Sequence, residues 1–384
     1  MERFASDIHR GECVMCGKCL EVCPLFQATD NEELSPRAKA DLLQAMAGGG
    51  DLSEAAVRRL AGICLGCQRC RDVCPQNVDV PRQLQALKAA HPGWRNWIWG
   101  RLVDNAPRLY PLLAAWGRRA PGLAPSSRRE LLRSLGRNRS LPDQVETGKA
   151  REGLVQEACM LFPGCAARFA KTGWLGTTEA VLKQAADTVL ATPDWACCGF
   201  TLGQAGLPEE QHRLQAENVR LWREAGRPRL VVFCATCLAG LQAYGALDDV
   251  WQDAAERDAW LTCLTPLWRL IPEPGPVPVP PLAGFKVVAH SPCHSEAGEG
   301  QWLAAVLRSQ GAEVLSLDQC CGLGGSMQLE HPELCTRVGH AFWDRVPSQI
   351  DAVVTGCAGC VIQLGATAPA GIQVGHWLEL LTTQ

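Results

Sequence analysis

The chain has 384 residues, which is long enough for two or three domains that each bury a core of their own. Its net charge of -3 gives no global reason to expect a nucleic-acid partner. The amino terminus has no basic region followed by an apolar core, and no apolar run reaches the roughly 18 residues of a membrane span. We therefore expect a cytoplasmic protein without an export signal or a transmembrane segment.

Cysteine is the residue type that departs most from ordinary composition, with 21 copies. In a short secreted chain this number would indicate disulfides, but this chain is long, rich in apolar residues and expected in a reducing compartment. Cysteines that bind metal as thiolates are the favoured interpretation, and a disulfide framework is the alternative.

Two cysteine runs with the spacing C-x2-C-x2-C-x3-C-P lie near the amino terminus. In such runs three cysteines hold one cubane [4Fe-4S] cluster, and the fourth, beside a proline, reaches a second cluster. The predicted ligands of the first cluster are Cys13, Cys16, Cys19 and Cys74, and those of the second are Cys64, Cys67, Cys70 and Cys23. The alternative metal is zinc, which prefers paired C-x2-C knuckles and four thiolates in a tetrahedron.

Helices are predicted between the two runs. Ser35 is placed to cap a helix with Pro36 in its first turn, and good helix formers continue it to Met46. A second helix is predicted over Asp51–Leu60, capped by Asp51 or Ser53. Residues 1–90 are therefore expected to form a helical dicluster ferredoxin domain. Basic residues near the cysteines could offset the charge of the clusters or be solvated surface groups; they are Lys18, Arg37, Arg69 and Arg71.

Residues 91–150 are rich in tryptophan and arginine. The first 49 of them contain ten arginines and two acidic residues, which gives a local charge of +8. Trp94, Trp97, Ile98 and Leu102 fall at helical spacing, which predicts an amphipathic helix with basic flanks.

Two interpretations of this helix stay open. It could lie on an anionic membrane surface, with its tryptophans at headgroup depth. It could instead pack across other domains or a second subunit with its tryptophans as core, which we favour because aromatic stripes are usually core. The polar stretch Arg128–Glu152 that follows is predicted to be a linker.

A different cysteine pattern occurs twice in the rest of the chain. In the first copy, Cys165 is followed after 31 residues by the pair Cys197-Cys198 and after 35 more by Cys234 and Cys237. In the second copy the two gaps are 26 and 35 residues. The copies are 123 residues apart at the cysteine pair and at both later cysteines, which indicates an internal duplication. Adjacent thiolates reach one metal assembly only if the backbone turns sharply, as the glycine after each pair allows, so we expect clusters with several metal atoms.

Short apolar runs alternate with helical stretches in both copies. The predicted strands are Leu154–Phe162, Arg229–Phe233, Lys286–His290 and Ala352–Thr355, and the predicted helices are Thr177–Val189 and Glu209–Glu224. Several of these strands lead directly to cysteines, which is typical of βα units with a site at the carboxyl edge of a parallel sheet.

These patterns predict an α+β multidomain chain in which two duplicated α/β domains follow the ferredoxin domain. The first cysteine-rich domain is expected at residues 151–270, a proline-rich extended connector at 271–283 and the second cysteine-rich domain at 284–384. No G-x-G-x-x-G fingerprint follows a strand and no phosphate-binding loop is present, so we expect no flavin or nucleotide site on this chain.

The pattern C-x31-CC-x35-C-x2-C resembles the cysteine-rich (CCG) domain of heterodisulfide reductase and its relatives. A dicluster ferredoxin domain followed by two such domains is similar, over nearly the whole chain, to the iron-sulfur subunits of glycolate oxidase and of anaerobic glycerol-3-phosphate dehydrogenase. The closing pair His376-Trp377 resembles the glycolate branch. The string from His290 to His294 and the later C-x2-C resemble the glycerol-3-phosphate branch.

The resemblance implies further ligands, because five cysteines of this pattern bind a non-cubane [4Fe-4S] cluster in the heterodisulfide reductase relatives. The implied ligands of one such cluster are Cys165, Cys197, Cys198, Cys234 and Cys237. The implied ligands of another are Cys293, Cys320, Cys321, Cys357 and Cys360. The 26-residue gap after Cys293 is shorter than the interval usual in the family, so we expect one or two clusters of this kind.

Four residues beside these patterns have weaker roles. His294 is either a neighbour that donates a hydrogen bond or relays a proton to a cluster, or an ordinary packed histidine. Cys159, Cys263 and Cys335 fit no pattern and are expected to be inert buried thiols.

Three functions are compatible with these features. The first is an electron-transfer subunit that carries electrons from a partner dehydrogenase with FAD toward quinone or another acceptor at the membrane surface. In that role the chain is not catalytic alone, and it could be peripheral on the inner face of the cytoplasmic membrane. The second is catalysis on disulfides at a CCG-bound cluster. The third, metal storage, is disfavoured because two complete sets of cubane ligands exceed what storage needs.

Overall fold

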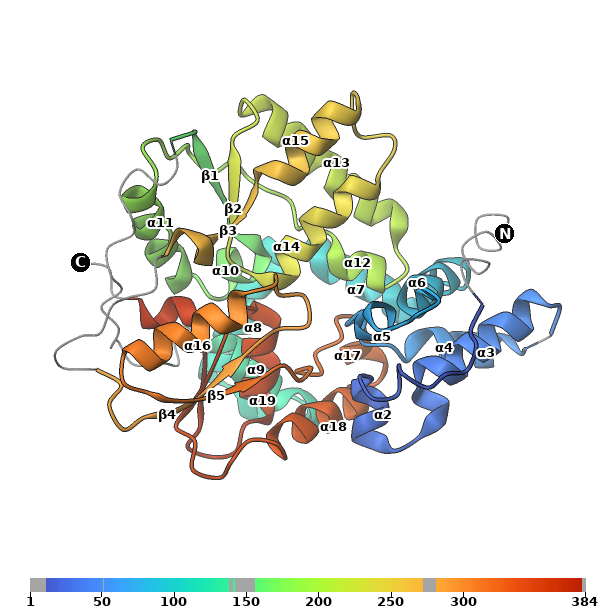
Figure 1. The fold of residues 1–384 in the computed structure, drawn as a ribbon. Helices are drawn as coiled ribbons and strands as arrows, with labels where there is room; N and C mark the ends of the chain where they lie inside the picture. The colour runs from blue at the N-terminus through green and yellow to red at the C-terminus, as the bar shows by residue number, and fades with distance from the viewer. Residues whose placement is uncertain (1–11, 51, 138–140, 142–155, 272–280, 382–384) are drawn as a thin grey trace. The chain divides into compact units, whose positions relative to one another are not determined.

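The structure, a computed structural model, describes residues 12–50, 52–137, 141, 156–271 and 281–381 (Figure 1). The chain forms two compact units, each assembled from three stretches of sequence. Unit 1 consists of Met1–Asp104, Thr201–Gln211 and Gln319–Arg345, and unit 2 of Asn105–Phe200, His212–Asp318 and Val346–Gln384.

Unit 1 is helical in its described residues. Its elements are α2 (Pro24–Thr29), η1 (Glu32–Leu34), α3 (Pro36–Ala47), α4 (Glu54–Gly62), α5 (Arg69–Asp72), α6 (Val80–Ala90), α7 (Trp94–Asp104), α17 (Met327–Glu330) and α18 (Pro332–Trp343). Leu43 of α3, Leu60 of α4 and Leu84 and Leu87 of α6 share one buried apolar cluster. Their spacing on each helix gives the apolar stripe that buries these helices against one another.

The predicted start of α3 is confirmed. The Ser35 hydroxyl accepts a hydrogen bond from the Ala38 N–H at 3.1 Å, and Pro36 occupies the first turn, where its missing N–H costs nothing. The next helix, α4, begins at Glu54 under a Ser53 cap, three residues later than the predicted start. The alternative cap, Asp51, lies outside the described residues.

Unit 2 contains two parallel sheets. The first has the order β1-β2-β3, with strands Cys159–Phe162, Arg229–Val232 and Leu264–Pro266. The second has the order β5-β4-β6-β7, with strands Glu313–Leu317, Lys286–His290, Ala352–Thr355 and Gln373–His376. Every pairing in both sheets is parallel. Buried runs such as Val353–Val354 are typical of sheets covered on both faces.

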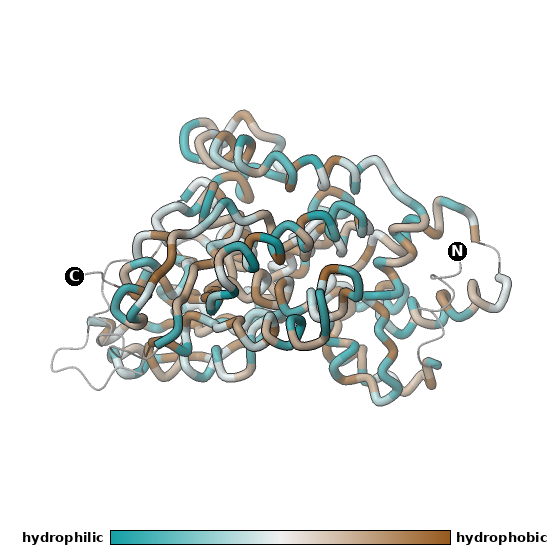
Figure 2. Tube along the Cα trace, turned by 90° about the horizontal axis from the view of Figure 1, so that it is seen from above, coloured by the Kyte–Doolittle hydropathy of each residue, from teal (hydrophilic) through white to brown (hydrophobic). Residues whose placement is uncertain are grey.

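Helices surround these sheets and connect their strands (Figure 1). In unit 2 they are α8 (Ala106–Arg119), η2 (Pro121–Leu123), α9 (Ser126–Gly136), α10 (Gly164–Phe169), α11 (Gly173–Ala185), α14 (Ala235–Gln242), η3 (Ala243–Ala246), α15 (Ala254–Cys263), η4 (Leu267–Leu270), α16 (Glu299–Ser309), α19 (Ala358–Thr367) and η5 (Trp377–Leu380). Two more, α12 (Phe200–Gln204) and α13 (Pro208–Glu224), begin in one unit and end in the other. Hydrophobic and hydrophilic residues alternate along many helices (Figure 2), as expected of helices with one buried face.

The duplication is visible in the structure. Strand β6 begins 123 residues after β2, and α19 begins 123 residues after α14, so each strand-to-helix unit repeats in register. This repeat, the parallel sheets and the helical unit 1 confirm the predicted fold class. The strands predicted at Lys286–His290 and Ala352–Thr355 have the observed bounds. The domain boundaries stay a prediction, and the connector over residues 272–280 lies outside the described residues.

Two expectations for the tryptophan-rich segment were wrong. Helix α9 (Ser126–Gly136) occupies the first part of the predicted linker, because its packing against α8 and α19 outweighs its polar composition. Ser134, for example, is buried and donates a hydrogen bond to the Val361 carbonyl at 3.3 Å. Most of the rest of that linker, residues 138–140 and 142–152, lies outside the described residues. Trp94 and Trp97 were expected to be core, but they are the most exposed tryptophans among the described residues.

A close contact between α8 and α9 depends on Gly117. A Cβ atom at this position would lie 1.9 Å from the Leu132 carbonyl oxygen, which is backbone and cannot move aside cheaply. Gly117→Ala is expected to lower the free energy of unfolding by about 2 kcal/mol or more, although alanine favours helix by roughly 1 kcal/mol. Gly176→Ala in α11 is the matched control, because nothing lies within 4 Å of its Cβ, and it should stabilise slightly. Urea unfolding of both variants measures the difference, and equal stability would contradict the close contact.

Candidate metal centres

Four cysteines of unit 1 line one small cavity near the amino terminus. They are Cys13, Cys16, Cys19 and Cys74, which is the combination predicted for the first cubane cluster. Lys18 and Arg37 line the same cavity. The loop that carries the first three cysteines turns through left-handed backbone at Met15 and at Gly17 (φ 82°), which lets alternate side chains face the same space. That these four thiolates bind iron stays a prediction.

A second cavity in unit 1 is lined by the other predicted set. Its cysteines are Cys23, Cys64, Cys67 and Cys70. Cys23 precedes Pro24 at the start of α2, so the chain direction changes there and the fourth thiol of the first run faces the second run. Each cavity thus combines three cysteines of one run with one cysteine of the other, as the predicted exchange requires.

Lys39 is a residue at this second cavity that sequence reasoning missed. It is 3% exposed, lines the cavity and donates a hydrogen bond from Nζ to the Leu34 carbonyl at 2.7 Å. A buried ammonium here partly offsets the charge of four thiolates. Its position in the sequence could have indicated it, because a lysine falls on the apolar face of a helix. The buried stripe of α3 consists of Pro36, Lys39, Ala40 and Leu43.

Burial sets the protonation state of these thiols. Desolvation raises the pKa of Cys70 far above the usual range of a thiol, and it raises the pKa of Cys23 despite the nearby Lys39 ammonium. Without metal these groups are therefore protonated at neutral pH. Binding as thiolates releases the protons, so the metal affinity of this cavity should rise with pH.

The first five-cysteine set is gathered in unit 2. Cys234 follows β2 and is the N-cap residue of α14, Cys237 lies in the first turn of that helix, and Cys165 follows β1. Hydrogen bonds from Cys165 and Cys198 lower the pKa of Cys197 well below the usual range of a thiol. The thiols of Cys237 and Cys198 are also hydrogen bonded, as are those of Cys234 and Cys237. One continuous group of five sulfur atoms therefore lies at the carboxyl ends of parallel strands.

Two glycines leave room at these thiols. A Cβ atom at Gly164 would lie 2.7 Å from Cys237 Sγ, and one at Gly240 would lie 3.0 Å from Cys198 Sγ. Gly199 has φ 76°, which supplies the turn directly after the cysteine pair. The donor set and its spacing fit a cluster with several iron atoms. When bound, such clusters supply one-electron oxidation and reduction.

The comparisons with known proteins agree with this division of the chain. Residues 11–78 match the model of the 4Fe-4S dicluster domain, and residues 159–242 and 287–365 each match the model of the cysteine-rich domain. The chain belongs to the family of iron-sulfur subunits built from these domains.

Similar proteins cover nearly the whole chain. The glycolate oxidase iron-sulfur subunit of Escherichia coli (strain K12) is 24% identical, and the alignment covers 96% of this chain and 92% of that protein. The probable glycolate oxidase iron-sulfur subunit of Bacillus subtilis (strain 168) is 23% identical, with 94% and 90% covered. A fumarate reductase (CoM/CoB) subunit of Methanothermobacter marburgensis is 22% identical, with 96% and 71% covered.

Asn218 and Tyr244 hold the Cys197-Cys198 turn of this iron-sulfur subunit. The Asn218 Nδ2 group donates hydrogen bonds to the Cys197 carbonyl at 3.2 Å and to the Tyr244 hydroxyl at 2.9 Å. Tyr244 in turn donates to the Cys198 carbonyl at 3.1 Å. Both side chains are fully buried, so they position the backbone of the cysteine pair. The sequence analysis missed both residues. The position of Asn218 between apolar residues on one face of the predicted helix could have indicated its role.

The second five-cysteine set is divided between the units. Cys293, Cys357 and Cys360 belong to unit 2, and Cys320 and Cys321 belong to unit 1. Within unit 2, hydrogen bonds from Cys234 and Cys360 lower the pKa of Cys357, so the C-x2-C groups of the two copies meet. Ligation of one cluster by this second set stays a prediction.

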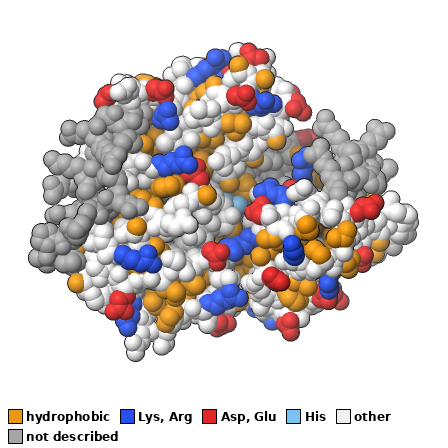
Figure 3. Space-filling view, viewed as in Figure 1, with side chains coloured by type: hydrophobic (Ala, Val, Ile, Leu, Met, Phe, Trp, Pro, Cys, Tyr) orange, Lys and Arg blue, Asp and Glu red, His pale blue; other side chains and the backbone are white. Residues whose placement is uncertain are grey.

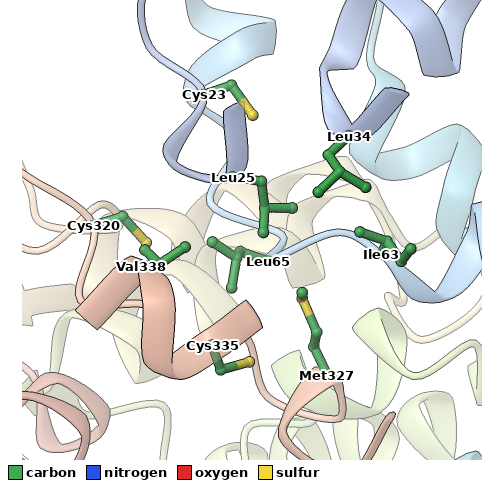
Figure 4. Close-up of a cluster of buried hydrophobic side chains, with 9 residues drawn as sticks. All are labelled: Cys23, Leu25, Leu34, Ile63, Leu65, Cys320, Met327, Cys335 and Val338. Atoms are coloured by element: carbon green, nitrogen blue, oxygen red, sulfur yellow. The ribbon is translucent and has the colours of Figure 1, made fainter. Parts of the chain in front are cut away.

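Within unit 1, Cys320 lies beside the cavity that Cys23, Cys64, Cys67 and Cys70 line. Its thiol is hydrogen bonded to Cys67, and this contact and burial raise the pKa of Cys67. Figure 4 shows Cys320 in the apolar cluster that also contains Cys23, with Leu65 and Val338 close to its thiol. Sulfur atoms from the ferredoxin domain and from the second cysteine-rich domain thus share one buried apolar environment.

The cysteines outside the patterns and His294 have ordinary surroundings. Cys159 and Cys335 are fully buried, and Cys263 is partly buried with its thiol 3.1 Å from the Trp260 carbonyl. His294 Nδ1 lies 3.8 Å from Cys293 Sγ, and its ring packs edge-on against Phe200 at 4.6 Å. Both roles considered for His294 therefore stay open.

No three His, Cys, Asp or Glu side chains in the described ranges converge as the ligands of a single metal ion do. No helix among the described residues is long and apolar enough to span a membrane.

Proposed function

We propose that this chain is the electron-transfer subunit of a flavin-dependent 2-hydroxy-acid dehydrogenase of the glycolate type. It would hold two cubane [4Fe-4S] clusters and one or two further [4Fe-4S] clusters, while FAD and the substrate bind a partner subunit. Electrons would leave for quinone, which places the chain at the inner face of the cytoplasmic membrane. The observation that carries this proposal is the pair of unit 1 cavities, each lined by the four cysteines of one predicted cubane.

Three features support conduction of electrons as the role. Clusters transfer one electron at a time, which is what a two-electron flavin needs between itself and a membrane acceptor. The contact between Cys320 and Cys67 brings a cysteine of the second CCG pattern to the cavity predicted for the second cubane. A cluster bound by Cys320 would therefore lie next to that cubane, close enough to exchange electrons with it. Two relatives whose alignments cover 90% or more of both chains are named as a glycolate oxidase iron-sulfur subunit and a probable one.

Anaerobic purification of the tagged chain from its own cells tests this proposal. We expect a flavin-containing protein to copurify, and we expect the complex to reduce a quinone analogue with glycolate while the isolated, iron-loaded chain does not. Turnover of glycolate by the isolated chain, or purification without any flavoprotein, would contradict the subunit role. Glycerol 3-phosphate should be assayed beside glycolate, because it is the alternative substrate of the same family.

Disulfide chemistry is the second candidate, and one observation favours it. Cys234 and Cys357, the equivalent cysteines of the two copies, are hydrogen bonded to each other, and Thr236 Oγ1 lies 3.2 Å from Cys357 Sγ. Two C-x2-C groups in contact are an arrangement at which a disulfide substrate could be split. Reduction of a disulfide to two thiols by the isolated, loaded chain, with dithionite supplying the two electrons and water the two protons, would favour this function over electron transfer to quinone.

A further inference from the structure

Two tryptophans of helix α7 lie on its exposed face, away from the core of unit 1. Trp94 is 68% exposed and Trp97, one turn later, is 58% exposed. The buried residues of this helix are Asn96, Gly100 and Val103, which lie on the other side at 100° per residue. The Asn96 side chain anchors that side by donating a hydrogen bond to the Ala205 carbonyl at 2.5 Å. Among the described residues, the packing of unit 1 therefore leaves most of both indoles exposed.

Arginines accompany both indoles. The Arg95 guanidinium lies over the Trp94 ring at 5.2 Å from its centroid, and the Arg101 guanidinium lies over the Trp97 ring at 5.4 Å. Each pair presents a flat apolar ring with a positive charge beside it. Indole rings with adjacent cations are typical of residues that settle at the headgroup level of an anionic bilayer.

A basic hollow of about 280 Å³ opens beside Trp94. Its basic lining residues are Arg58, Arg59, Arg95 and Lys88. Lys88 is 6% exposed, and its ammonium lies 3.6 Å from Glu330 Oε1, so it is held in place within the hollow.

The charge of this hollow is positive. The carboxylates that contact its lining residues are Glu330, Glu54, which pairs with Arg58 at 3.0 Å, and Glu333, which lies 3.6 Å from His331. The four arginine and lysine side chains thus outnumber three acids, in a chain whose net charge is -3. Basic and acidic side chains are interspersed on the face of the molecule shown in Figure 3.

We propose that Trp94, Trp97 and this hollow form a docking surface for an anionic phospholipid membrane. The phosphate of a headgroup would enter the basic hollow, and the two indoles would lie at the same depth in the bilayer interface. The proposal deepens the proposed function and rests on it, because a subunit that delivers electrons to quinone must reach the membrane. Charge complementarity and the exposed indoles select the lipid surface as the occupant.

Sedimentation with lipid vesicles tests this surface on the full-length, iron-loaded chain. We expect binding to vesicles of phosphatidylcholine mixed with phosphatidylglycerol, weakening as salt is raised, and no binding to phosphatidylcholine alone. Arg95→Ser should weaken binding about fivefold at low salt. The double variant Trp94→Ser/Trp97→Ser should weaken it about tenfold or more. Lys183→Ser, which removes an exposed basic side chain from α11 of unit 2, is the matched control and should bind like the unchanged chain.

Two results would overturn the docking surface. One is equal binding to both kinds of vesicle, and the other is unchanged binding by the tryptophan double variant. The iron content and urea midpoint of each variant show that it is folded. The assay contains no flavoprotein, substrate or quinone, so its failure leaves the electron-transfer role standing. If no flavoprotein copurifies with the chain but the chain still binds anionic vesicles, the electron-transfer role is contradicted and the docking surface stands.

Discussion

Replacing Cys67 by serine is expected to remove one cubane cluster, about four iron atoms for each chain. Cys67 lines the second unit 1 cavity with three other cysteines, and its thiol also contacts Cys320. A hydroxyl is a far weaker ligand than a thiolate for iron in these clusters, so the cluster should be lost or strongly weakened. Iron and sulfide analysis after anaerobic reconstitution, together with electron paramagnetic resonance of the reduced protein, measures the loss.

Two comparisons make this experiment specific. Cys263→Ser is the matched control, because its thiol lies 3.1 Å from a backbone carbonyl and lines neither unit 1 cavity. It should keep the full iron content. Cys16→Ser should remove the other cubane and leave the signal that Cys67→Ser abolishes. Unchanged iron in Cys67→Ser would falsify the assignment of the second cavity, and stoichiometric zinc in place of iron would contradict both cavities.

Cys320→Ser separates two roles of the thiol beside Cys67. If Cys320 belongs only to the second CCG pattern, its replacement should leave both cubane signals in place. If it also supports the cubane in the second cavity, the signal lost in Cys67→Ser should weaken here too. Measuring both variants in parallel tests whether the predicted five-cysteine set is separate from the cubane set.

The fold was predictable wherever short-range signals were strong. The strand Ala352–Thr355 is a buried run with three β-branched residues that leads to Cys357, and its bounds were predicted correctly. The cap at Ser35 is a local hydrogen bond, so the sequence around it suffices to place the start of α3. Because the pattern of strand, cysteine and helix occurs in both copies of the duplication, each βα unit was predicted twice, and βα units imply parallel sheets.

Long-range packing explains what the sequence could not predict. Helix α9 is rich in arginine and has no strong local signal, and it exists because α8 and α19 cover its face. Trp94 and Trp97 have the spacing of a core stripe, yet the helix buries Asn96, Gly100 and Val103 instead. Residue hydrophobicity alone does not say which face of a helix finds a partner.

In the candidate sites, too, residues fixed by local spacing were predictable and residues brought together by long-range packing were not. The cysteines of both unit 1 cavities were predictable because their spacing is dictated by the cluster they would hold. Lys39 and Asn218 were not, because each acts on a cysteine through a fold that brings distant residues together. A buried polar residue on an otherwise apolar helix face is the signal that both share.

A buried carboxylate in unit 2 should make a large contribution to stability. The Glu256 side chain is 2% exposed and forms ion pairs with Arg223 at 2.6 Å and Arg227 at 2.7 Å. It also accepts a hydrogen bond from the Gln252 N–H at 2.8 Å. The hydrogen bonds from Arg223 and the Gln252 backbone, with the charges of both arginines, lower the pKa of Glu256 to about 2, against an ordinary 4.5.

The direction of the pH effect follows from this lowered pKa. Between pH 4.5 and about 2 the unfolded chain binds the proton while the folded chain does not, so stability falls as the pH falls through this window. Above pH 4.5 the contribution is complete. We expect Glu256→Gln to lower the free energy of unfolding by about 3 kcal/mol at pH 7, because two guanidinium groups then face a neutral amide.

Urea unfolding of matched variants at pH 7 checks this expectation. Glu217→Gln is the control, because Glu217 lies on the exposed side of α13, is 42% exposed and pairs with Arg220 at 2.6 Å. An exposed pair of this kind contributes about 0.5 kcal/mol or less. As the pH is lowered from 5 to 3, the unchanged chain should lose stability relative to Glu256→Gln, since only the former can take up a proton at this site. A constant difference between the two over that range, or equal destabilisation by both substitutions at pH 7, would show that the Glu256 carboxylate carries no special share of the stability of unit 2.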